Sequence, residues 1–528
     1  MNNPSLQNNI KMWDVSALVY LSIPLMLFIW GWLEPWIAIP LILFIVFSIW
    51  KLTFVTIKNT NKIRFVISPR EYIPSLLIFV LYIFMTGMTG NWAQHTDYYV
   101  RNDIFWELTT KSWPPNLPDE RYFIYYFQSW LPAALFGSFL GWKIAQWAYF
   151  LWTVLGMIIS LHYIFKSVGK ISFWVACIFF AWNGLELIPC SLLAPLLQDI
   201  SISEAFMQND HVAGHFLTEA PCFSMKNIVH CFVPISIIGG MLLQSGNVRS
   251  IGFSLGILAV MYSPMSSIFL LPILLYLFIR EYVHKNTEGK YALDWRCMIK
   301  EGLSVYNISY MAPFFLLIIP FYAGAESFHE AKPQLLFDVK NFTLFCVYLF
   351  FNSVISVMLI RRNVKSYFVW LVFVVHSLCM LSGLIFHDDI AMKGSVATTY
   401  FLIILYCQAF CRENTRFKIV YVIYSMLGAL FFVHMTGALL CVVVAIGCRY
   451  LLRLKIWQGV SALAALVLTL VATEIFMPQM LTSYKDKLAG KQVRYHRNMG
   501  VYQQDGGSGL WWWYRTFPHR KDMPIWFK

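Results

Sequence analysis

Charged side chains are scarce in this chain of 528 residues: only 13% are Asp, Glu, Lys or Arg. The chain also has no P-loop, no GxGxxG pattern, no CxxC pair and no low-complexity tract, which excludes the usual signatures of nucleotide binding and of zinc ribbons. It has no basic run of the kind that binds nucleic acid, so we expect no nucleic-acid partner. The excess of 40 basic over 27 acidic residues is typical of lysine and arginine in the cytoplasmic loops of a membrane protein.

Apolar residues make up 59% of the chain and aromatic residues 18%, and the mean hydropathy is +0.60. Because roughly 20 apolar residues cross a bilayer as a helix, the sequence predicts an all-α, polytopic integral membrane protein with about 13 to 15 transmembrane or re-entrant helices. The cysteines lie mostly in apolar runs, where we expect them to be packing residues. The runs of spanning length fall at about 15–33, 36–56, 72–90, 143–166, 172–189, 226–244, 303–323, 341–360, 366–386, 395–411, 417–433, 436–452 and 457–476.

Two further stretches are ambiguous. Residues 122–141 contain Pro132 and polar side chains, and residues 250–282 are too long for one span, short for two and broken at Pro264. Lysine and arginine in the short loops place the N-terminus in the cytoplasm, provided that 122–141 enters the membrane without crossing it. Four polar segments then share the extracytoplasmic face, namely 91–121, 190–225, 387–395 and the tail from 478.

The predicted organisation is a transmembrane domain, residues 1–476, followed by a basic and aromatic extracytoplasmic tail, residues 477–528. Within the first domain, 91–141 forms the first outer loop with amphipathic and re-entrant helices, and 190–225 forms the second. We expect the outer segments to meet at one site, because they lie on the same face of a chain that is otherwise apolar.

The stretch 94–107 concentrates three carboxylates and four aromatic residues. If it is helical, Asp97 and Arg101 lie one turn apart on one face, and Asp103 and Glu107 lie one turn apart on another. We therefore expect an amphipathic helix at the membrane surface, with its aromatic residues toward the lipid and its acids exposed. Two interpretations stay open, a plain interfacial helix held by an aromatic belt and a part of a catalytic site.

The chain then re-enters the membrane with Tyr126, Gln128 and Pro132 close together. Proline and polar side chains at membrane depth are tolerated where protein or a water-filled cavity covers the freed backbone groups. We therefore expect this segment to form one wall of a cavity.

The second outer loop contains His211, His215 and Glu219 at i, i+4 and i+8, a spacing that puts three metal ligands on one helical face. Gly214 and the lack of an HExxH pattern weaken this signal, and the alternative is a set of polar residues that line a cavity or lid. We assign no metal site, and a divalent cation is the one cofactor that this pattern leaves open.

Two further basic segments are candidate anion sites. Lys393 opens a predicted helix after Asp388 and Asp389, and a helix N-terminus with a lysine is suited to an anion; the alternative is a short loop with compensating charges. In the tail, Arg494 and Arg497 lie near aromatic residues. They suit a phosphorylated lipid head group or a saccharide, and equally a membrane-surface anchor.

This layout resembles the GT-C glycosyltransferases, which are polytopic enzymes that use sugars carried on polyprenyl phosphate or pyrophosphate and have an acidic site in the first outer loop. The resemblance covers the layout of about the first 250 residues. Short motifs also resemble those of large bacterial membrane proteins of that type: Asp97-Tyr98-Tyr99 with Arg101-Asn102, Trp113-Pro114-Pro115, Leu131-Pro132-Ala133-Ala134-Leu135, Ser263-Pro264 and Asp389-Ile390-Ala391-Met392-Lys393.

The chain departs from two branches of that superfamily. It has Asp97-Tyr98 where protein mannosyltransferases have a paired Asp-Glu, and Trp511-Trp512-Trp513-Tyr514 has no acid after it, unlike the WWD-type motif of oligosaccharyltransferases. The tail is also too short for a folded sugar-binding domain. The resemblance therefore implies transfer to a glycan or lipid acceptor at the extracytoplasmic face of a bacterial cytoplasmic membrane, in cell-envelope polysaccharide biosynthesis.

Such a transfer requires a base for the acceptor hydroxyl and positive charge for the departing phosphate. Asp97 is the candidate base of a single, inverting displacement, because it is the acid nearest the membrane edge. Asp103 and Glu107 are the supporting acids. The expected phosphate ligands are Arg101, Lys393, Arg494 and Arg497, and the expected acceptor or cavity-lining residues are His95, Asp388, Asp389, Gln128 and Tyr126.

Three rival functions stay open. A transporter or flippase for a lipid-linked saccharide predicts ionisable residues through the interiors of the spans and a repeat between halves. A glycan polymerase or ligase predicts large outer loops rich in arginine. A structural membrane partner explains the hydropathy but not the polar face. The acids of this chain gather at one face, which favours the enzyme.

Overall fold

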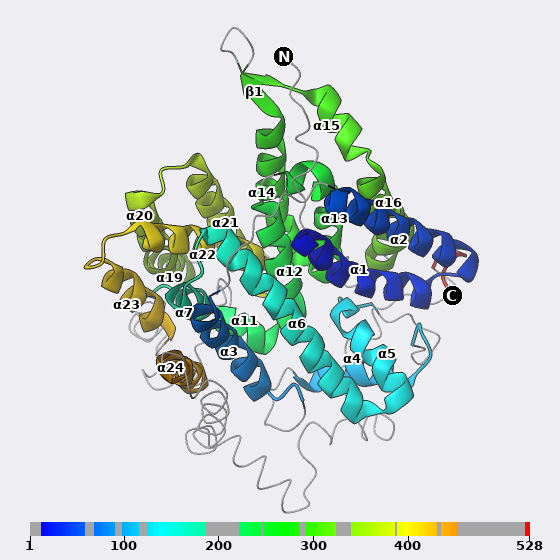
Figure 1. Cartoon of the computed structure of the whole chain (residues 1–528), viewed down its shortest axis with the longest axis horizontal. Helices are drawn as coiled ribbons and strands as arrows, with labels where there is room; N and C mark the ends of the chain where they lie inside the picture. The colour runs from blue at the N-terminus through cyan, green and yellow to red at the C-terminus, as the bar shows by residue number, and fades with distance from the viewer. Residues whose placement is uncertain are drawn as a thin grey trace, which may run out of the picture.

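The protein is described by a computed structural model, which covers residues 12–58, 68–89, 98–115, 124–185, 221–244, 246–285, 291–323, 339–385, 388–429, 435–451 and 523–528. Within these ranges the chain is a bundle of packed helices with one short β-hairpin (Figure 1). The predicted all-α, polytopic architecture is therefore confirmed.

In the hairpin, β1 (Val283–Lys285) pairs antiparallel with β2 (Tyr291–Leu293). The helices are α1 (Met12–Trp32), α2 (Pro35–Lys58), α3 (Pro69–Met85), α4 (Tyr98–Thr110), η3 (Gln128–Trp130), α5 (Leu131–Leu140), α6 (Trp142–Val168), α7 (Phe173–Ala181), α11 (Pro221–Asn227), α12 (Val229–Leu242), α13 (Asn247–Tyr262), α14 (Pro264–Tyr282), α15 (Trp295–Gly302), α16 (Val305–Pro313), η5 (Phe314–Ile318), α17 (Ile319–Ala323), α19 (Val339–Leu349), η6 (Phe350–Val354), α20 (Ile355–Asn363), α21 (Tyr367–Ile385), α22 (Asp388–Arg412), α23 (Lys418–Ala429) and α24 (Met435–Leu451).

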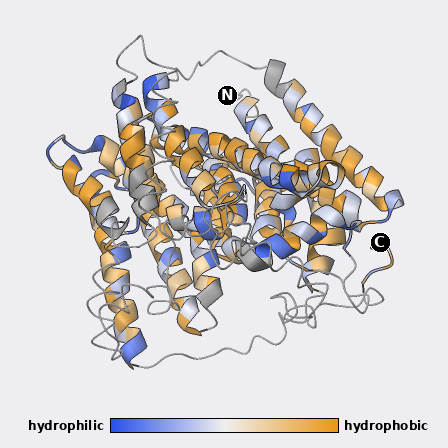
Figure 2. Ribbon diagram, turned by 90° about the horizontal axis from the view of Figure 1, so that it is seen from below, coloured by the Kyte–Doolittle hydropathy of each residue, from blue (hydrophilic) through white to orange (hydrophobic). Residues whose placement is uncertain are grey.

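Eight helices in the described ranges are long and apolar enough to cross a membrane. Large apolar side chains stay exposed along them; Trp36 and Leu43 on α2 are examples. Such a surface is unfavourable in water and suits contact with lipid, and Figure 2 shows apolar residues along most of the helices. The chain is therefore an integral membrane protein. The eight spans are Met12–Trp32, Pro35–Phe54, Trp142–Val168, Pro264–Tyr282, Val305–Ala323, Val339–Asn363, Tyr367–Ile385 and Ile390–Arg412.

The two ambiguous stretches adopt definite structures. The helix α5 has ten residues, about 15 Å of helix, which is half the thickness of a bilayer core. It packs back against α6 after a turn at Gly141, as a segment that enters the membrane without crossing would do. Residues 247–282 form two helices, α13 and α14, which pack against each other and are separated at Ser263. The Ser263 hydroxyl accepts a hydrogen bond from the Ser266 N–H and so caps α14.

The centre of the bundle is α12, in which every residue is buried. It packs against α6, α13 and α22. Gly239 and Gly240 lie against the rings of Tyr163 and Tyr400, and the missing side chains let these helices approach closely. In Figure 1, α6 crosses the molecule from α5 to the region of α22, so α6 and α22 each connect one end of the bundle to the other.

At one of these ends, remote helix termini are joined by polar contacts. The Asp14 carboxylate, in the first turn of α1, accepts hydrogen bonds from Tyr163 Oη at 2.7 Å and Asn247 Nδ2 at 3.2 Å, and lies 3.5 Å from Lys166 Nζ. Gln408, near the end of α22, donates to the Ser167 carbonyl at 2.8 Å. We call this the paired end. Its other ion pairs are Glu71 with Arg449, Arg249 with Glu301, and Arg362 with Glu413.

The last residues of the chain lie against the turn between α1 and α2. Phe527 forms a β-bridge with Leu33, and the Glu34 N–H donates to the Trp526 carbonyl at 2.9 Å. The Trp526 indole N–H also donates to the Leu316 carbonyl at 2.8 Å. Residues 526–528 and the α1–α2 turn therefore share one side of the bundle.

Candidate functional site

A small cavity lies at the opposite end of α6 from Lys166. The space that a water-sized sphere can enter is about 20 Å³, which is room for about one water molecule. Four helices and the turn after α3 supply its walls, so segments far apart in sequence meet there. The cavity is lined by Met88, Arg101, Asn102, Phe105, Trp130, Gln146, Tyr149, Val229 and His230.

The helix α4 contributes three of these residues. It forms where the sequence predicts one, and it packs on α5 and α6. Arg101, Asn102 and Phe105 face the cavity, and Phe105 anchors the helix through its ring, 5.1 Å from that of Trp142 and 5.6 Å from that of Tyr149. Arg101 is thus a predicted site residue that the structure places at a cavity.

The acids of α4 do not point into water, so that part of the prediction is wrong. Asp103 and Glu107 have only 4% and 7% of their surface exposed. At 100° per residue they lie on the far side of the helix from Arg101 and Phe105, and they do not line the cavity. Glu107 is paired with Lys111 at 2.6 Å. The helix is therefore packed on both sides, where the sequence pattern predicts one solvated face.

Burial changes the acidity of Asp103. Loss of hydration raises the pKa of this carboxyl to about 7, and the neighbouring charge of Glu107 adds to the increase. One carboxylate oxygen, Oδ2, has no hydrogen-bond partner. The Asp103 carboxyl therefore holds its proton more tightly than an exposed aspartate would, and it lies on α4 next to the site.

Four rings form a stack beside the cavity. Tyr125 and Tyr126 are stacked at 4.1 Å between ring centroids, and Tyr126 is stacked on His230 at 5.3 Å. Trp130 lies 4.9 Å from His230 and 6.1 Å from Tyr125, so it contacts both ends of this row. Ser129 Oγ donates to the His230 carbonyl at 2.6 Å, which ties η3 to the start of α12. We call Tyr125, Tyr126, Trp130 and His230 the aromatic stack.

Lys393 reaches this stack from α22, more than 260 residues further along the chain than Tyr126. Its ammonium group lies 5.5 Å from the centroid of the Tyr126 ring, within the range of a cation–π interaction. Its backbone carbonyl accepts a hydrogen bond from Ser266 Oγ at 2.5 Å, which joins α22 to α14. The structure therefore brings Tyr126 and Lys393, two predicted site residues, into contact.

Arg101 and Lys393 both lie at the aromatic stack. Arg101 lines the cavity together with Trp130 and His230, and Lys393 lies over the ring of Tyr126. Burial raises the pKa of Tyr125, while the positive charges of Lys393 and Arg101 each lower it. Two cations predicted as phosphate ligands, one from α4 and one from α22, thus converge on the aromatic stack.

Two polar groups at the cavity have no hydrogen-bond partner. They are the Nε2 atoms of Gln146 and His230, in side chains that are both 2% exposed. Buried polar groups in proteins nearly always have a partner, which is often an ordered water or a ligand. The cavity is therefore built for a polar occupant.

The predicted anion site at a helix N-terminus needs correction. The helix α22 begins at Asp388, so Lys393 lies in its second turn, where backbone N–H groups are already used within the helix. Lys393 therefore acts through its ammonium group. Gln128 is fully buried in η3 and does not line the cavity, although its neighbour Trp130 does.

Several predicted residues lie outside the described ranges. They include Asp97, which precedes the first residue of α4. The side chains of Asp388 and Asp389 are also not described. Within the described ranges, no three His, Cys, Asp or Glu residues are grouped as metal ligands. The other predicted residues outside those ranges are His95, Arg494, Arg497, His211, His215 and Glu219.

Sequence reasoning missed Gln146, Tyr149 and His230. Gln146 and His230 each lie in an apolar run, and polar side chains within such runs are signals of function in membrane proteins. Applied to these runs, that rule identifies both residues. It does not predict that they meet at one cavity, because Gln146 and His230 are more than 80 residues apart in the sequence.

Comparison of the chain with models of known protein families, with curated proteins and with solved structures finds no match.

Proposed function

We propose that this protein is a GT-C-like membrane glycosyltransferase. It moves a sugar from a polyprenyl-phosphate-type lipid donor to a glycan or lipid acceptor. The observation that carries the proposal is the convergence of Arg101 and Lys393 on the aromatic stack. Two cations from distant helices beside aromatic rings are suited to a phosphate that carries a sugar.

In the proposed reaction the acceptor hydroxyl oxygen attacks the anomeric carbon, and the bond from that carbon to the phosphate oxygen breaks. Asp97 takes the proton of the hydroxyl. Arg101 and Lys393 stabilise the negative charge on the departing lipid phosphate, where each such group contributes about 10²–10³ in rate. A single displacement of this kind inverts the anomeric centre.

The size of the cavity limits what it holds. Room for about one water molecule suits a hydroxyl group or a phosphate oxygen and is too small for a sugar ring. We therefore place only one oxygen of the reaction there, either of the acceptor hydroxyl or of the departing phosphate, next to Gln146 and His230, whose unpartnered Nε2 atoms suit hydrogen bonds to it. The rest of the donor lies outside the cavity.

The proposed location is a bacterial cytoplasmic membrane, with the N-terminus in the cytoplasm and the site at the extracytoplasmic face, in cell-envelope polysaccharide biosynthesis. The lipid-linked donor, the acceptor and membrane lipid are the proposed partners. No residue of the proposed mechanism requires a metal, although a divalent cation could be tested in the same assay.

The experiment uses the full chain in lipid vesicles with a panel of polyprenyl-phosphate sugars and scores release of the carrier phosphate. Asp97→Asn is expected to reduce turnover about 10²–10⁴-fold, because amide oxygen is a poor base. The matched control is Asp294→Asn, at an exposed helix cap that asparagine also fills. Near-wild-type transfer by Asp97→Asn would contradict the proposal.

The alternative function is a transporter or flippase for a lipid-linked saccharide. It is favoured by Asp14, an acid that is 1% exposed inside the bundle. However, Asp14 belongs to the paired end, where it lies beside Lys166 of α6. Lys166 and Gln146 are 20 residues apart on that helix, so Asp14 lies far from the cavity. The same vesicles distinguish the two functions, because a flippase moves the lipid-linked sugar across the bilayer without release of carrier phosphate.

A further inference from the structure

The segment between α14 and α16 lies at a face of the membrane. It leaves one candidate span at Tyr282 and enters the next at Val305. It consists of the β-hairpin and the eight-residue helix α15. Figure 1 shows the hairpin and α15 at the top, far from α4 and α5. The segment is therefore separate from the candidate functional site.

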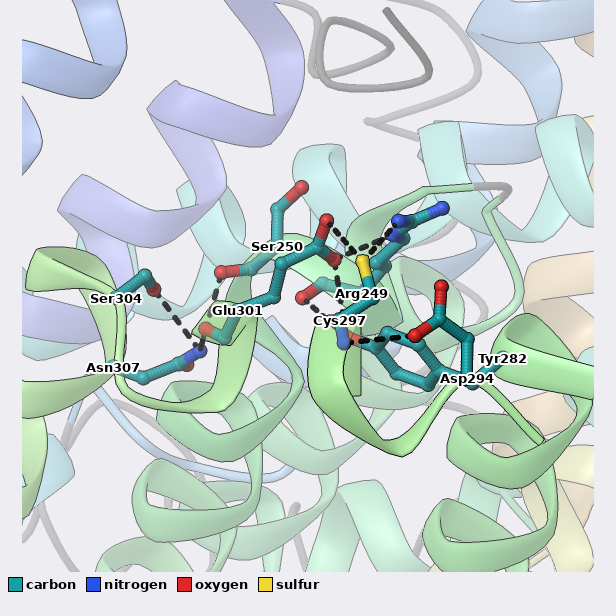
Figure 3. Close-up of polar contacts among 8 residues, drawn as sticks. All are labelled: Arg249, Ser250, Tyr282, Asp294, Cys297, Glu301, Ser304 and Asn307. Carbon is teal, nitrogen blue, oxygen red and sulfur yellow. Dashed lines mark hydrogen bonds and ion pairs between the residues drawn. The ribbon is translucent and has the colours of Figure 1, made fainter. Parts of the chain in front are cut away.

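The inner face of α15 is fixed by polar contacts to α13 and α14, drawn in Figure 3. Glu301 Oε2 accepts hydrogen bonds from Arg249 Nε at 2.5 Å and from Tyr282 Oη at 3.0 Å. Cys297 Sγ donates to Glu301 Oε1 at 3.3 Å. Gly302 lies against the ring of Phe253, so closely that the ring would have to shift slightly to make room for a side chain. These contacts set which side of α15 faces outward.

The outer face combines an apolar stripe with a basic one. Trp295, Ile299 and Leu303 are 55%, 48% and 57% exposed, and their spacing of four residues places them on one side. Arg296 and Lys300, also exposed, form a parallel stripe next to it. The Arg296 guanidinium lies 5.6 Å from the Trp295 ring.

The two cations of this face have no ion-pair partner within the described part of the chain. The nearby acids are already engaged: Glu301 pairs with Arg249 on the inner side, and Asp294 accepts a hydrogen bond from the Cys297 N–H at 3.0 Å. The outer face therefore carries two positive charges beside exposed apolar groups at the border of the membrane.

We propose that the outer face of α15, made of Trp295, Arg296, Ile299, Lys300 and Leu303, binds anionic phospholipid of the adjacent leaflet. The apolar stripe inserts among the upper acyl carbons, and tryptophan favours this depth. Arg296 and Lys300 lie at the level of the phosphate groups and pair with the extra negative charge of the lipid. The charge complementarity selects an anionic over a zwitterionic head group.

The test is a titration of the detergent-solubilised full chain with phosphatidylglycerol, followed by native mass spectrometry that counts retained lipids. Arg296→Gln with Lys300→Gln is expected to weaken phosphatidylglycerol binding about fivefold for each charge removed, about 25-fold for both. Binding of phosphatidylcholine is expected to stay unchanged.

The matched control is Lys340→Gln with Arg416→Gln, which removes the same charge from exposed positions on α19 and in the turn between α22 and α23. The conservative exchange Arg296→Lys with Lys300→Arg should keep full binding, and helical circular dichroism checks that each variant is folded. An equal loss of phosphatidylglycerol in the test and control pairs would overturn the proposal, as would an equal loss of phosphatidylcholine in the test pair. Neither outcome depends on sugar transfer, so this test is independent of the proposed function.

Discussion

The paired end and the cavity end of this protein treat polar groups in opposite ways. At the paired end, Asp14 lies against Tyr163, Asn247 and Lys166, so its charge is surrounded by donors. At the cavity end, Lys393 lies over an aromatic ring, and Gln146 and His230 each keep a side-chain nitrogen without a partner.

The distance between the two ends matches the thickness of a bilayer core. Lys393 and Glu413 are 20 residues apart on and just after α22, which is about 30 Å of helix and about one bilayer core. An apolar chain keeps its polar groups at the two water-facing ends. Ion pairs at one end stabilise the assembly of helices, whereas the unpartnered nitrogens at the cavity suit an exchangeable ligand.

The largest expected effect is on sugar transfer at the cavity end. Arg101→Gln and Lys393→Gln should each reduce kcat/KM about 10²–10³-fold, because each removes positive charge from the leaving phosphate. The double variant should lose less than the product of the two, since both cations act on one group. Carrier-phosphate release measures all three, with Lys340→Gln as the control. Full additivity would show that the two cations serve different groups.

A change at the paired end should alter stability and not transfer. Asp14→Ala leaves Tyr163, Asn247 and Lys166 without their shared acceptor, at a cost of about 2–4 kcal/mol in the free energy of unfolding. Denaturant titration of the purified protein in detergent measures it. Asp294→Ala, which removes an exposed cap, should cost about 1 kcal/mol. Equal losses in the two variants would contradict the distinction drawn for the paired end.

The pH dependence of stability tests the burial of Asp103. Its pKa is about 7 in the folded chain and about 4 when unfolded, so the folded state holds this proton more tightly. Stability is therefore greatest below pH 4 and falls as the pH rises toward 7, by on the order of 2–4 kcal/mol from this group. Asp103→Asn should remove that loss and unfold at a higher temperature than the wild type at pH 8. A difference in stability between Asp103→Asn and the wild type that does not change with pH would contradict this prediction.

The smallest expected effect concerns the aromatic stack. Tyr126→Leu removes the ring under Lys393 and should weaken donor binding by about 1 kcal/mol, seen as a KM about fivefold higher with kcat nearly unchanged. Tyr126→Phe keeps the ring face and should behave as the wild type. A large fall in kcat in Tyr126→Phe would assign chemistry to the hydroxyl group instead.

Much of the fold follows from periodicity and hydropathy. The spans predicted at 15–33 and 36–56 correspond to α1 and α2, and the helix predicted around Asp97 to Glu107 corresponds to α4. Local patterns determine these elements because an apolar run in a bilayer must satisfy its own backbone hydrogen bonds. The sequence also identified Arg101, Tyr126 and Lys393 as candidates for one site.

The predictions failed where contacts with other helices determine the surroundings of a side chain. Asp103 and Glu107 have the spacing of a solvated face, yet both are buried by packing that local sequence does not encode. The helix predicted to start near Lys393 starts at Asp388, which moves the lysine away from the free N–H groups. Gln146 and His230 look like other polar residues in apolar runs, and only their shared position at the cavity distinguishes them.

By itself, the sequence determined that this chain is a helical bundle in a membrane and which short segments are candidates for its site, because composition and periodicity are local properties. Tertiary structure alone decided that Arg101 and Lys393 meet at one aromatic stack and that α15 turns its basic side outward. The first depends on segments almost 300 residues apart, and the second on contacts of α15 with α13 and α14, whose partners no local pattern specifies.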